Sequence, residues 1–213
     1  MDLLVHEKIY RTEELVKKLS RVSLTLCGVG AIGSNLCDNI IRQGFNNITV
    51  IDKDRIETHN SGTQIWDGKE KGLLKVAAMK TRAYNSTGSI LNSVSKELNS
   101  GNIKKFLTGT DIVIDSFDNS NSRNLVYQFC MEKGIECLHV GLYQDFAEII
   151  WNESYTVPKD TTALDVCEYP LARNIILLAV AVTSEALIKF IDKGIKKNYM
   201  ITLKDLKISE YHS

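Results

Sequence analysis

The chain has 213 residues, and its 26 Lys and Arg residues balance 26 Asp and Glu residues, so the formal net charge is zero. A neutral chain offers no electrostatic footprint for nucleic acid or an anionic membrane, and we expect neither partner. No apolar run approaches the ~20 residues that a bilayer span needs, and the amino terminus is charged where a signal peptide needs an apolar segment. The composition therefore predicts a soluble, cytoplasmic protein.

The chain contains few of the features that divide or crosslink a protein. Its five cysteines form no C-x-x-C pair, and no histidine stands at ligand spacing from them, so neither a zinc site nor a disulfide framework is predicted. Two prolines and no repeat give no sign of a linker. We expect one domain over residues 1–213, with an N-terminal helix at about 4–19, a nucleotide-binding core at about 22–141, and a crossover loop with C-terminal helix and strands at about 142–213.

Apolar periodicity and turn residues predict alternating strands and helices. After the first helix come a strand at 22–27, a helix at 31–44, strands at 47–52 and 89–95 around a helix at 75–85, a helix at 100–107 that Ser100 could cap, and a strand at 111–115. A helix at 119–134, strands at 135–141 and 147–152, a long apolar helix at 171–191 and a terminal strand or strand pair at 199–208 complete the chain. This order predicts a Rossmann-like α/β fold: a mostly parallel sheet with helices on both faces and a C-terminal antiparallel extension.

The stretch CGVGAIGS carries the first chemical motif. It places Gly28, Gly30 and Gly33 in G-x-G-x-x-G order, directly after a predicted strand and at the start of a helix. Such glycines permit a tight turn and close approach of a phosphate to the helix N-terminus. Asp52, at the end of the second strand, is placed to accept hydrogen bonds from a ribose. The alternative is that the glycines serve only helix–sheet packing.

A polar stretch from Asp52 to Lys75 is longer than an ordinary connection between a strand and a helix. It carries Asp54, Asn60 and Gln64, and it ends at Lys75. Each of these taken alone is typical of solvated surface. Together, amide, carboxylate and lysine side chains beside a phosphate-binding turn favour a nucleoside triphosphate over the dinucleotide of a dehydrogenase.

In these motifs the sequence resembles the ThiF/MoeB/HesA superfamily, the bacterial relatives of the ubiquitin-activating enzymes. The resemblance runs from HEKIYR through GVGAIGS, D-x-D, N-x-x-x-Q and SFDNSNSR to the helix ending TSEALIKFI. It implies binding of ATP and Mg²⁺, and adenylation of the C-terminal glycine of a ubiquitin-like or sulfur-carrier protein with release of pyrophosphate. It also implies a homodimer.

The resemblance assigns roles to individual residues. It implies nucleotide contacts for Gly28, Gly30, Gly33, Asp52, Asp54, Asn60, Gln64, Lys75, Asn119 and Arg123, and catalytic roles for Lys75 and Asp118. Asp118 matches the family aspartate associated with Mg²⁺, and its place after a strand at the carboxyl edge of the sheet suits that role. From the residues alone, Asp118 serves equally well as the cap of the helix that follows. Asp115 we expect to support the fold, and His59 and His139 receive no role.

Three departures from the family pattern stand out. Thr63 occupies the position of an arginine directed at the triphosphate, and Arg11 or Lys75 could supply the missing charge. Arg11 matches an arginine that reaches the partner subunit's site, although a surface role on the first helix is an equal alternative. The paired C-x-x-C motifs of many relatives are missing, so no zinc is expected, and the length leaves no room for a separate catalytic-cysteine domain.

Cys167 lies in a predicted loop where some relatives carry a cysteine that attacks the adenylate or carries sulfur. The neighbouring Asp165 and Glu168 would raise the pKa of its thiol and oppose that role. The sequence as a whole predicts an ATP-dependent nucleotidyltransferase. An NAD(P)-dependent oxidoreductase and a non-catalytic nucleotide-binding adaptor are the alternatives.

Overall fold

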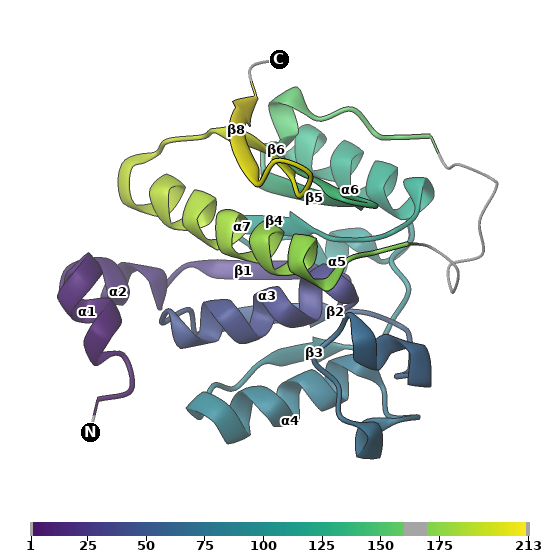
Figure 1. Ribbon diagram of the computed structural model, residues 1–213, viewed down its shortest axis with the longest axis horizontal. Helices are drawn as coiled ribbons and strands as arrows, with labels where there is room; N and C mark the ends of the chain where they lie inside the picture. The colour runs from purple at the N-terminus through teal and green to yellow at the C-terminus, as the bar shows by residue number, and fades with distance from the viewer. Residues whose placement is uncertain (1, 160–169, 212–213) are drawn as a thin grey trace.

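The computed structural model describes residues 2–159 and 170–211 (Figure 1). Its strands form one sheet in the order β3-β2-β1-β4-β5-β6-β7-β8. Their bounds are β1 Ser23–Cys27, β2 Asn47–Ile51, β3 Asn92–Val94, β4 Ile112–Asp115, β5 Glu136–Tyr143, β6 Phe146–Trp151, β7 Asn198–Thr202 and β8 Lys207–Tyr211. Pairings from β3 through to β5 are parallel and those from β5 to β8 are antiparallel, which confirms the predicted Rossmann-like fold with its antiparallel extension.

Helices cover both faces of the sheet because the central strands are apolar on both sides. The helices are α1 Val5–Arg11, α2 Glu13–Leu19, α3 Ala31–Arg42, α4 Lys75–Thr87, α5 Ile103–Leu107, α6 Ser120–Lys133 and α7 Arg173–Lys193, with short 3₁₀ turns at Thr58–Gly62, Gly68–Glu70 and Asn152–Ser154. On β4, Ile112 and Ile114 join the core under α3, α4 and α7, whereas Val113 joins the core under α5 and α6. The period-2 alternation of the strands thus divides the interior into two cores.

Two local predictions are wrong. The first helix is broken into α1 and α2 at Thr12, whose φ of 85° and ψ of 149° no helix contains. Thr12 instead caps α2, since its hydroxyl accepts a hydrogen bond from the Leu15 amide. Ser100 is not the cap of α5: the helix begins three residues later, after Asn102, whose side chain accepts a hydrogen bond from the Asn99 amide in the turn before the helix.

The expectation that no segment reaches the length of a bilayer span also needs correction. By length and composition α7 is long and apolar enough to cross a membrane. However, 56% of its most apolar window is buried inside the protein, where the helix packs on α3 and β6. Its apolar character is therefore explained by its place in the core.

Candidate functional site

The glycine turn connects β1 to α3 at the carboxyl edge of the parallel strands, on the right in Figure 1. Gly28 has a φ of +95°, and a Cβ built on it would lie 3.0 Å from the Ser116 carbonyl oxygen. A Cβ on Gly33 would lie 2.0 Å from the Gly28 carbonyl oxygen. Gly30, the N-cap of α3, has no atom of the described residues within 4 Å of its Cβ position. Packing explains Gly28 and Gly33, whereas Gly30 leaves open space at the helix N-terminus, where a phosphate would fit.

Asp52 and Lys75 lie beside this turn and are both buried. One carboxylate oxygen of Asp52 accepts a hydrogen bond from the Val29 amide at 2.7 Å, and the other accepts one from the Asp54 amide at 2.8 Å. Burial raises the pKa of Asp52, and the positive charge of Lys75 opposes that rise. The Lys75 ammonium lies 3.2 Å from the exposed carboxylate of Asp54. These three residues therefore form a connected charged group next to the glycine turn.

The amides of Asn60 and Gln64 are also buried. Their side-chain oxygens serve the fold: Asn60 accepts from the Glu57 amide at 2.8 Å, and Gln64 accepts from the Trp66 indole at 2.5 Å. These bonds shape the turn that brings the 58–64 segment over α3. Nucleotide contacts of Asn60 and Gln64 stay a prediction.

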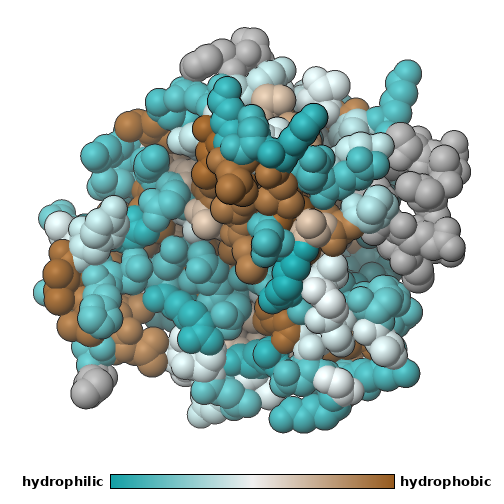
Figure 2. Space-filling model, viewed as in Figure 1, coloured by the Kyte–Doolittle hydropathy of each residue, from teal (hydrophilic) through white to brown (hydrophobic). Residues whose placement is uncertain are grey.

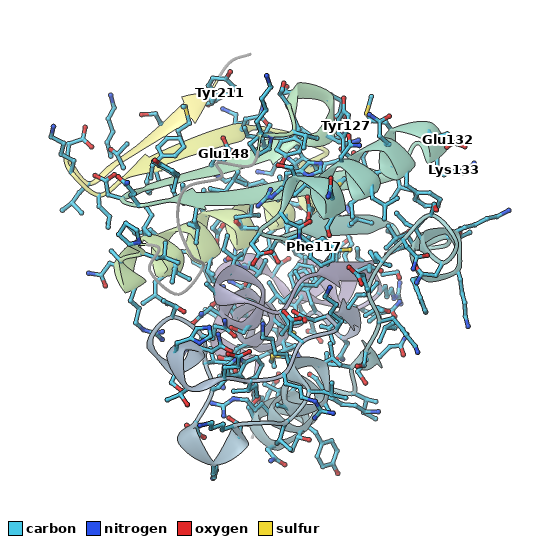
Figure 3. All side chains as sticks on the ribbon, turned by 90° about the vertical axis from the view of Figure 1, so that its right-hand side faces the viewer. Phe117, Tyr127, Glu132, Lys133, Glu148 and Tyr211 are labelled. Atoms are coloured by element: carbon cyan, nitrogen blue, oxygen red, sulfur yellow. The ribbon has the colours of Figure 1, made fainter. Side chains whose placement is uncertain are left out.

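Asp118 lies in the short connection between β4 and α6 and is exposed at the same edge of the sheet. The cap of α6 is Asn119, whose side-chain oxygen accepts a hydrogen bond from the Ser122 amide at 2.9 Å. The alternative that Asp118 caps the helix is therefore wrong. Figure 3 looks onto this edge, with Phe117 near its centre. Because Asn119 takes the capping role, the carboxylate of Asp118 remains at the surface of the carboxyl edge.

A buried polar network holds the loop that carries Asp118 against the sheet. Asp115 and His139 are fully buried, and the Nδ1 atom of His139 lies 2.8 Å from Oδ2 of Asp115. The other carboxylate oxygen of Asp115 accepts a hydrogen bond from the Phe117 amide at 3.1 Å. The Nε2 atom of His139 lies 2.7 Å from the Asn152 amide oxygen, and its ring stacks on Tyr155 at 3.7 Å between centroids. The network thus ties the Asp118 loop to β5 and to the segment after β6.

Arg123 belongs to this network. Its Nη1 atom donates to the Tyr155 hydroxyl at 3.0 Å, and its Nη2 atom donates to the Val140 carbonyl at 2.8 Å. Burial lowers the pKa of the guanidinium, but Asp115, Tyr155 and Glu148 together outweigh this effect, so the pKa is raised. Both described hydrogen bonds of Arg123 point into the protein, and its predicted contact with nucleotide stays a prediction.

Sequence reasoning missed His139 and Tyr155 as members of the site. A signal for the first was available: Asp115 at the end of β4 and His139 within β5 are buried polar residues on two apolar strands that prove to be neighbours, and they are paired directly in the sheet register. Tyr155 follows β6 in an irregular segment and gave no signal.

Arg11 and Cys167 remain to be placed. Arg11 forms ion pairs with Glu7 in α1 and with Glu185 in the second half of α7, and α1 lies at the left in Figure 1, away from the glycine turn. Within one chain Arg11 therefore does not join the site, and its contribution to a partner subunit's site stays a prediction. Cys167 lies outside the described residues.

The expected Mg²⁺ would bind at the carboxyl edge of the sheet. No group of three or more His, Cys, Asp or Glu side chains able to hold a metal occurs in the described part of the chain. Mg²⁺ does not require such a group of side chains when nucleotide phosphates supply its other ligands, because one or two carboxylates are then enough. The exposed carboxylate of Asp118 fits that pattern.

Comparison with known proteins gave a consistent result. The model of the ThiF family matches residues 6–166. The sulfur carrier protein ThiS adenylyltransferase of Bacillus subtilis is 25% identical over 134 residues, which cover 60% of this chain and 40% of that protein. The SAMP-activating enzyme E1 of Haloferax volcanii is 25% identical over 124 residues, covering 57% of this chain and 46% of that protein. The matched region thus spans less than half of either curated relative.

Among solved structures, E. coli MccB crystallised with ATP superposes with a TM-score of 0.83 at 19% identity. The superposition covers 99% of this chain and 71% of the MccB chain. This likeness establishes a shared fold.

Proposed function

This chain belongs to the ThiF family, and on that premise we propose that it is an ATP-dependent adenylyltransferase. Its substrate is the C-terminal glycine carboxylate of a ubiquitin-like or sulfur-carrier protein, which it converts to an acyl-adenylate with release of pyrophosphate. Curated relatives named for ThiS and SAMP activation support the kind of partner.

The observation that carries this proposal is the open space over Gly30. At the N-terminus of α3, this space is flanked by the Asp52–Lys75 group and lies on the same edge of the sheet as Asp118. Free amide groups and the helix dipole there favour a phosphate. The site thus combines space for a phosphate at the N-terminus of α3, a buried lysine and an exposed carboxylate.

In the reaction, an oxygen of the glycine carboxylate attacks the α-phosphorus of ATP. The new oxygen–phosphorus bond forms as the bond from the α-phosphorus to the bridging oxygen breaks, and the electron pair leaves with pyrophosphate. No proton transfer and no covalent enzyme intermediate are needed. Lys75 contributes positive charge next to the phosphates, and the amide groups of the first turn of α3 hold them in place.

Asp118 would hold Mg²⁺ together with the phosphate oxygens, and the ion would neutralise phosphate charge. The network of Asp115, His139 and Arg123 contributes by holding the Asp118 loop in one position. Asp52 would orient the ribose while also fixing the glycine turn through the Val29 amide.

We also propose a homodimer, because α1 has no buried residue in the single chain. Ile9 and Tyr10 are 77% and 81% exposed, and Figure 2 shows apolar side chains at the left end of the molecule, over this helix. A second copy of the chain would cover them, and light scattering of the wild type and of Ile9→Asp would test this. Loss of a dimer in Ile9→Asp supports the proposal, and a monomeric wild type contradicts it.

The function is tested by incubating the protein with ATP, Mg²⁺ and a panel of ubiquitin-like carriers that end in Gly-Gly. Mass spectrometry should detect a carrier whose mass has increased by one adenylyl group, and only when its terminal carboxylate is free. A carrier with an amidated C-terminus is the matched control. Equal labelling of both carriers, or ATP binding without labelling of any carrier, would contradict the proposed reaction.

A further inference from the structure

Arg173 is the first residue of α7 and is exposed at the carboxyl edge. Its Nη1 atom donates a hydrogen bond to the carbonyl oxygen of Gly62 at 3.4 Å. The crossover after β6 has thus returned the chain to the edge of the sheet at which the glycine turn lies. In Figure 1 the first turns of α3 and α7 lie at the same side of the molecule.

A short chain of hydrogen bonds connects Arg173 to the glycine turn. The Asn35 side-chain amide donates to the carbonyl of Ala31 at 2.7 Å and to the carbonyl of Thr63 at 3.0 Å. Asn35 therefore holds the Gly62–Thr63 segment against the first turn of α3, which begins at Gly30. Since Arg173 contacts Gly62, its guanidinium lies at the edge of the proposed phosphate-binding site.

The charge balance of the proposed site favours an additional positive side chain such as Arg173. Asp52, Asp54 and Asp118 bring negative charge to an edge that is proposed to bind a triphosphate. Lys75 already pairs with Asp54, and Arg11 pairs with Glu7 and Glu185. Glu185 lies about 18 Å along α7 from Arg173 at the usual helical rise.

Arg173 is differently placed. Within residues 2–159 and 170–211 no carboxylate lies within ion-pairing distance of it, and its described side-chain contact is the single long bond to a carbonyl. A guanidinium in this state can exchange that bond for bidentate hydrogen bonds to phosphate oxygens at little cost. It also begins a helix, where the dipole adds to the attraction for an anion.

We infer that Arg173 binds the β- and γ-phosphates of ATP and supplies, from α7, the positive charge that Thr63 does not provide. This inference rests on the proposed function. As the bond between the α-phosphorus and the bridging oxygen breaks, the electron pair moves onto pyrophosphate, and Arg173 stabilises the charge that collects there.

The test compares Arg173→Gln and Arg173→Lys with the wild type, using isothermal titration calorimetry with ATP, pyrophosphate and AMP in the presence of Mg²⁺. AMP lacks the two phosphates that Arg173 is inferred to contact. We expect Arg173→Gln to weaken binding of ATP and pyrophosphate about tenfold while leaving AMP binding unchanged, and Arg173→Lys to show a smaller loss. Arg21→Gln changes an exposed arginine just before β1, at the amino edge of the strands, and as the matched control it should bind all three like the wild type.

Equal losses for ATP and AMP, or no loss for ATP, would overturn the role of Arg173. A wild type that binds neither ATP nor AMP would refute the proposed function itself, and the inference would fall with it. If the wild type binds ATP and Arg173→Gln binds it equally well, only the inference about Arg173 is refuted. Thermal unfolding of each variant confirms that an exposed substitution has left the fold intact.

Discussion

Asp115 and His139 face each other across neighbouring parallel strands, with 2.8 Å between Oδ2 and Nδ1 and with both side chains fully buried. One end of this pair holds the Phe117 amide next to Asp118, and the other end reaches Asn152. The pair therefore connects the loop of the proposed catalytic carboxylate to the segment that leads into the crossover.

Removing the histidine should destabilise the protein strongly. His139→Ala removes one hydrogen-bond partner of the buried Asp115 carboxylate, which still has the Arg123 guanidinium 3.9 Å away, so we expect a loss of about 1.5–3 kcal/mol in the free energy of unfolding. Urea denaturation measures this cost. His59→Ala, at an exposed histidine, should change the free energy of unfolding by less than about 0.5 kcal/mol. Equal effects of the two substitutions would show that the Asp115–His139 pair does not stabilise the fold.

Tyr155→Phe tests the contact between Arg123 and the segment after β6. The substitution keeps the ring that stacks on His139 but removes the hydroxyl that accepts from Arg123. A buried guanidinium N–H then lacks its acceptor, so we expect a loss of about 1–3 kcal/mol in the free energy of unfolding. Tyr84→Phe, at an exposed tyrosine, is the control and should be neutral; a neutral Tyr155→Phe would mean that the Arg123 bond contributes nothing.

Two glycines three residues apart should respond differently to alanine. Gly33→Ala places a Cβ 2.0 Å from the Gly28 carbonyl oxygen, so the turn must move and the melting temperature should fall. Within residues 2–159 and 170–211, Gly30→Ala meets no atom within 4 Å, so the melting temperature should stay nearly unchanged. It should nevertheless weaken ATP binding, because the methyl group occupies the space proposed for phosphate. Unchanged ATP affinity in Gly30→Ala would place the phosphate elsewhere.

The raised pKa of Glu148 predicts that the stability of the protein depends on pH. Burial raises its pKa above 4.5, although the charge of Arg123 opposes the rise. A raised carboxyl pKa in the folded state means that the folded protein holds the proton more tightly than the unfolded chain. The stabilising contribution is therefore complete below pH 4.5 and is lost as the pH rises through the folded-state pKa. Glu148→Gln should remove this part of the decline when the free energy of unfolding is followed from pH 4.5 upward, and an unchanged slope would contradict the shift.

The order of elements could be predicted because each strand and helix carries its own periodic pattern. Errors arose where a non-local contact decides the local structure. The sequence from 4 to 19 reads as one helix, yet Thr12 breaks it, and Arg11 next to the break binds Glu185 on α7. Only the folded chain brings these residues together.

The glycine turn, Asp52 and Lys75 were found by their spacing from predicted strand ends, and the structure brings them together. Arg173 could not be found in this way, because its place beside Gly62 depends on the packing of α7 against α3. His139 was open to prediction only once β4 and β5 were known to be neighbours.

The central claim is that this chain forms an acyl-adenylate at the carboxyl edge of its sheet, with Asp118 at the reacting phosphates. The most direct measurement is ATP–pyrophosphate exchange with Mg²⁺ and Gly-Gly carriers, for the wild type, Asp118→Ala and Glu132→Ala, an exposed carboxylate at the far end of α6 (Figure 3). We predict carrier-dependent exchange in the wild type and in Glu132→Ala, reduced about 100-fold or more in Asp118→Ala. Exchange that does not depend on a carrier, or that survives in Asp118→Ala, would contradict the account.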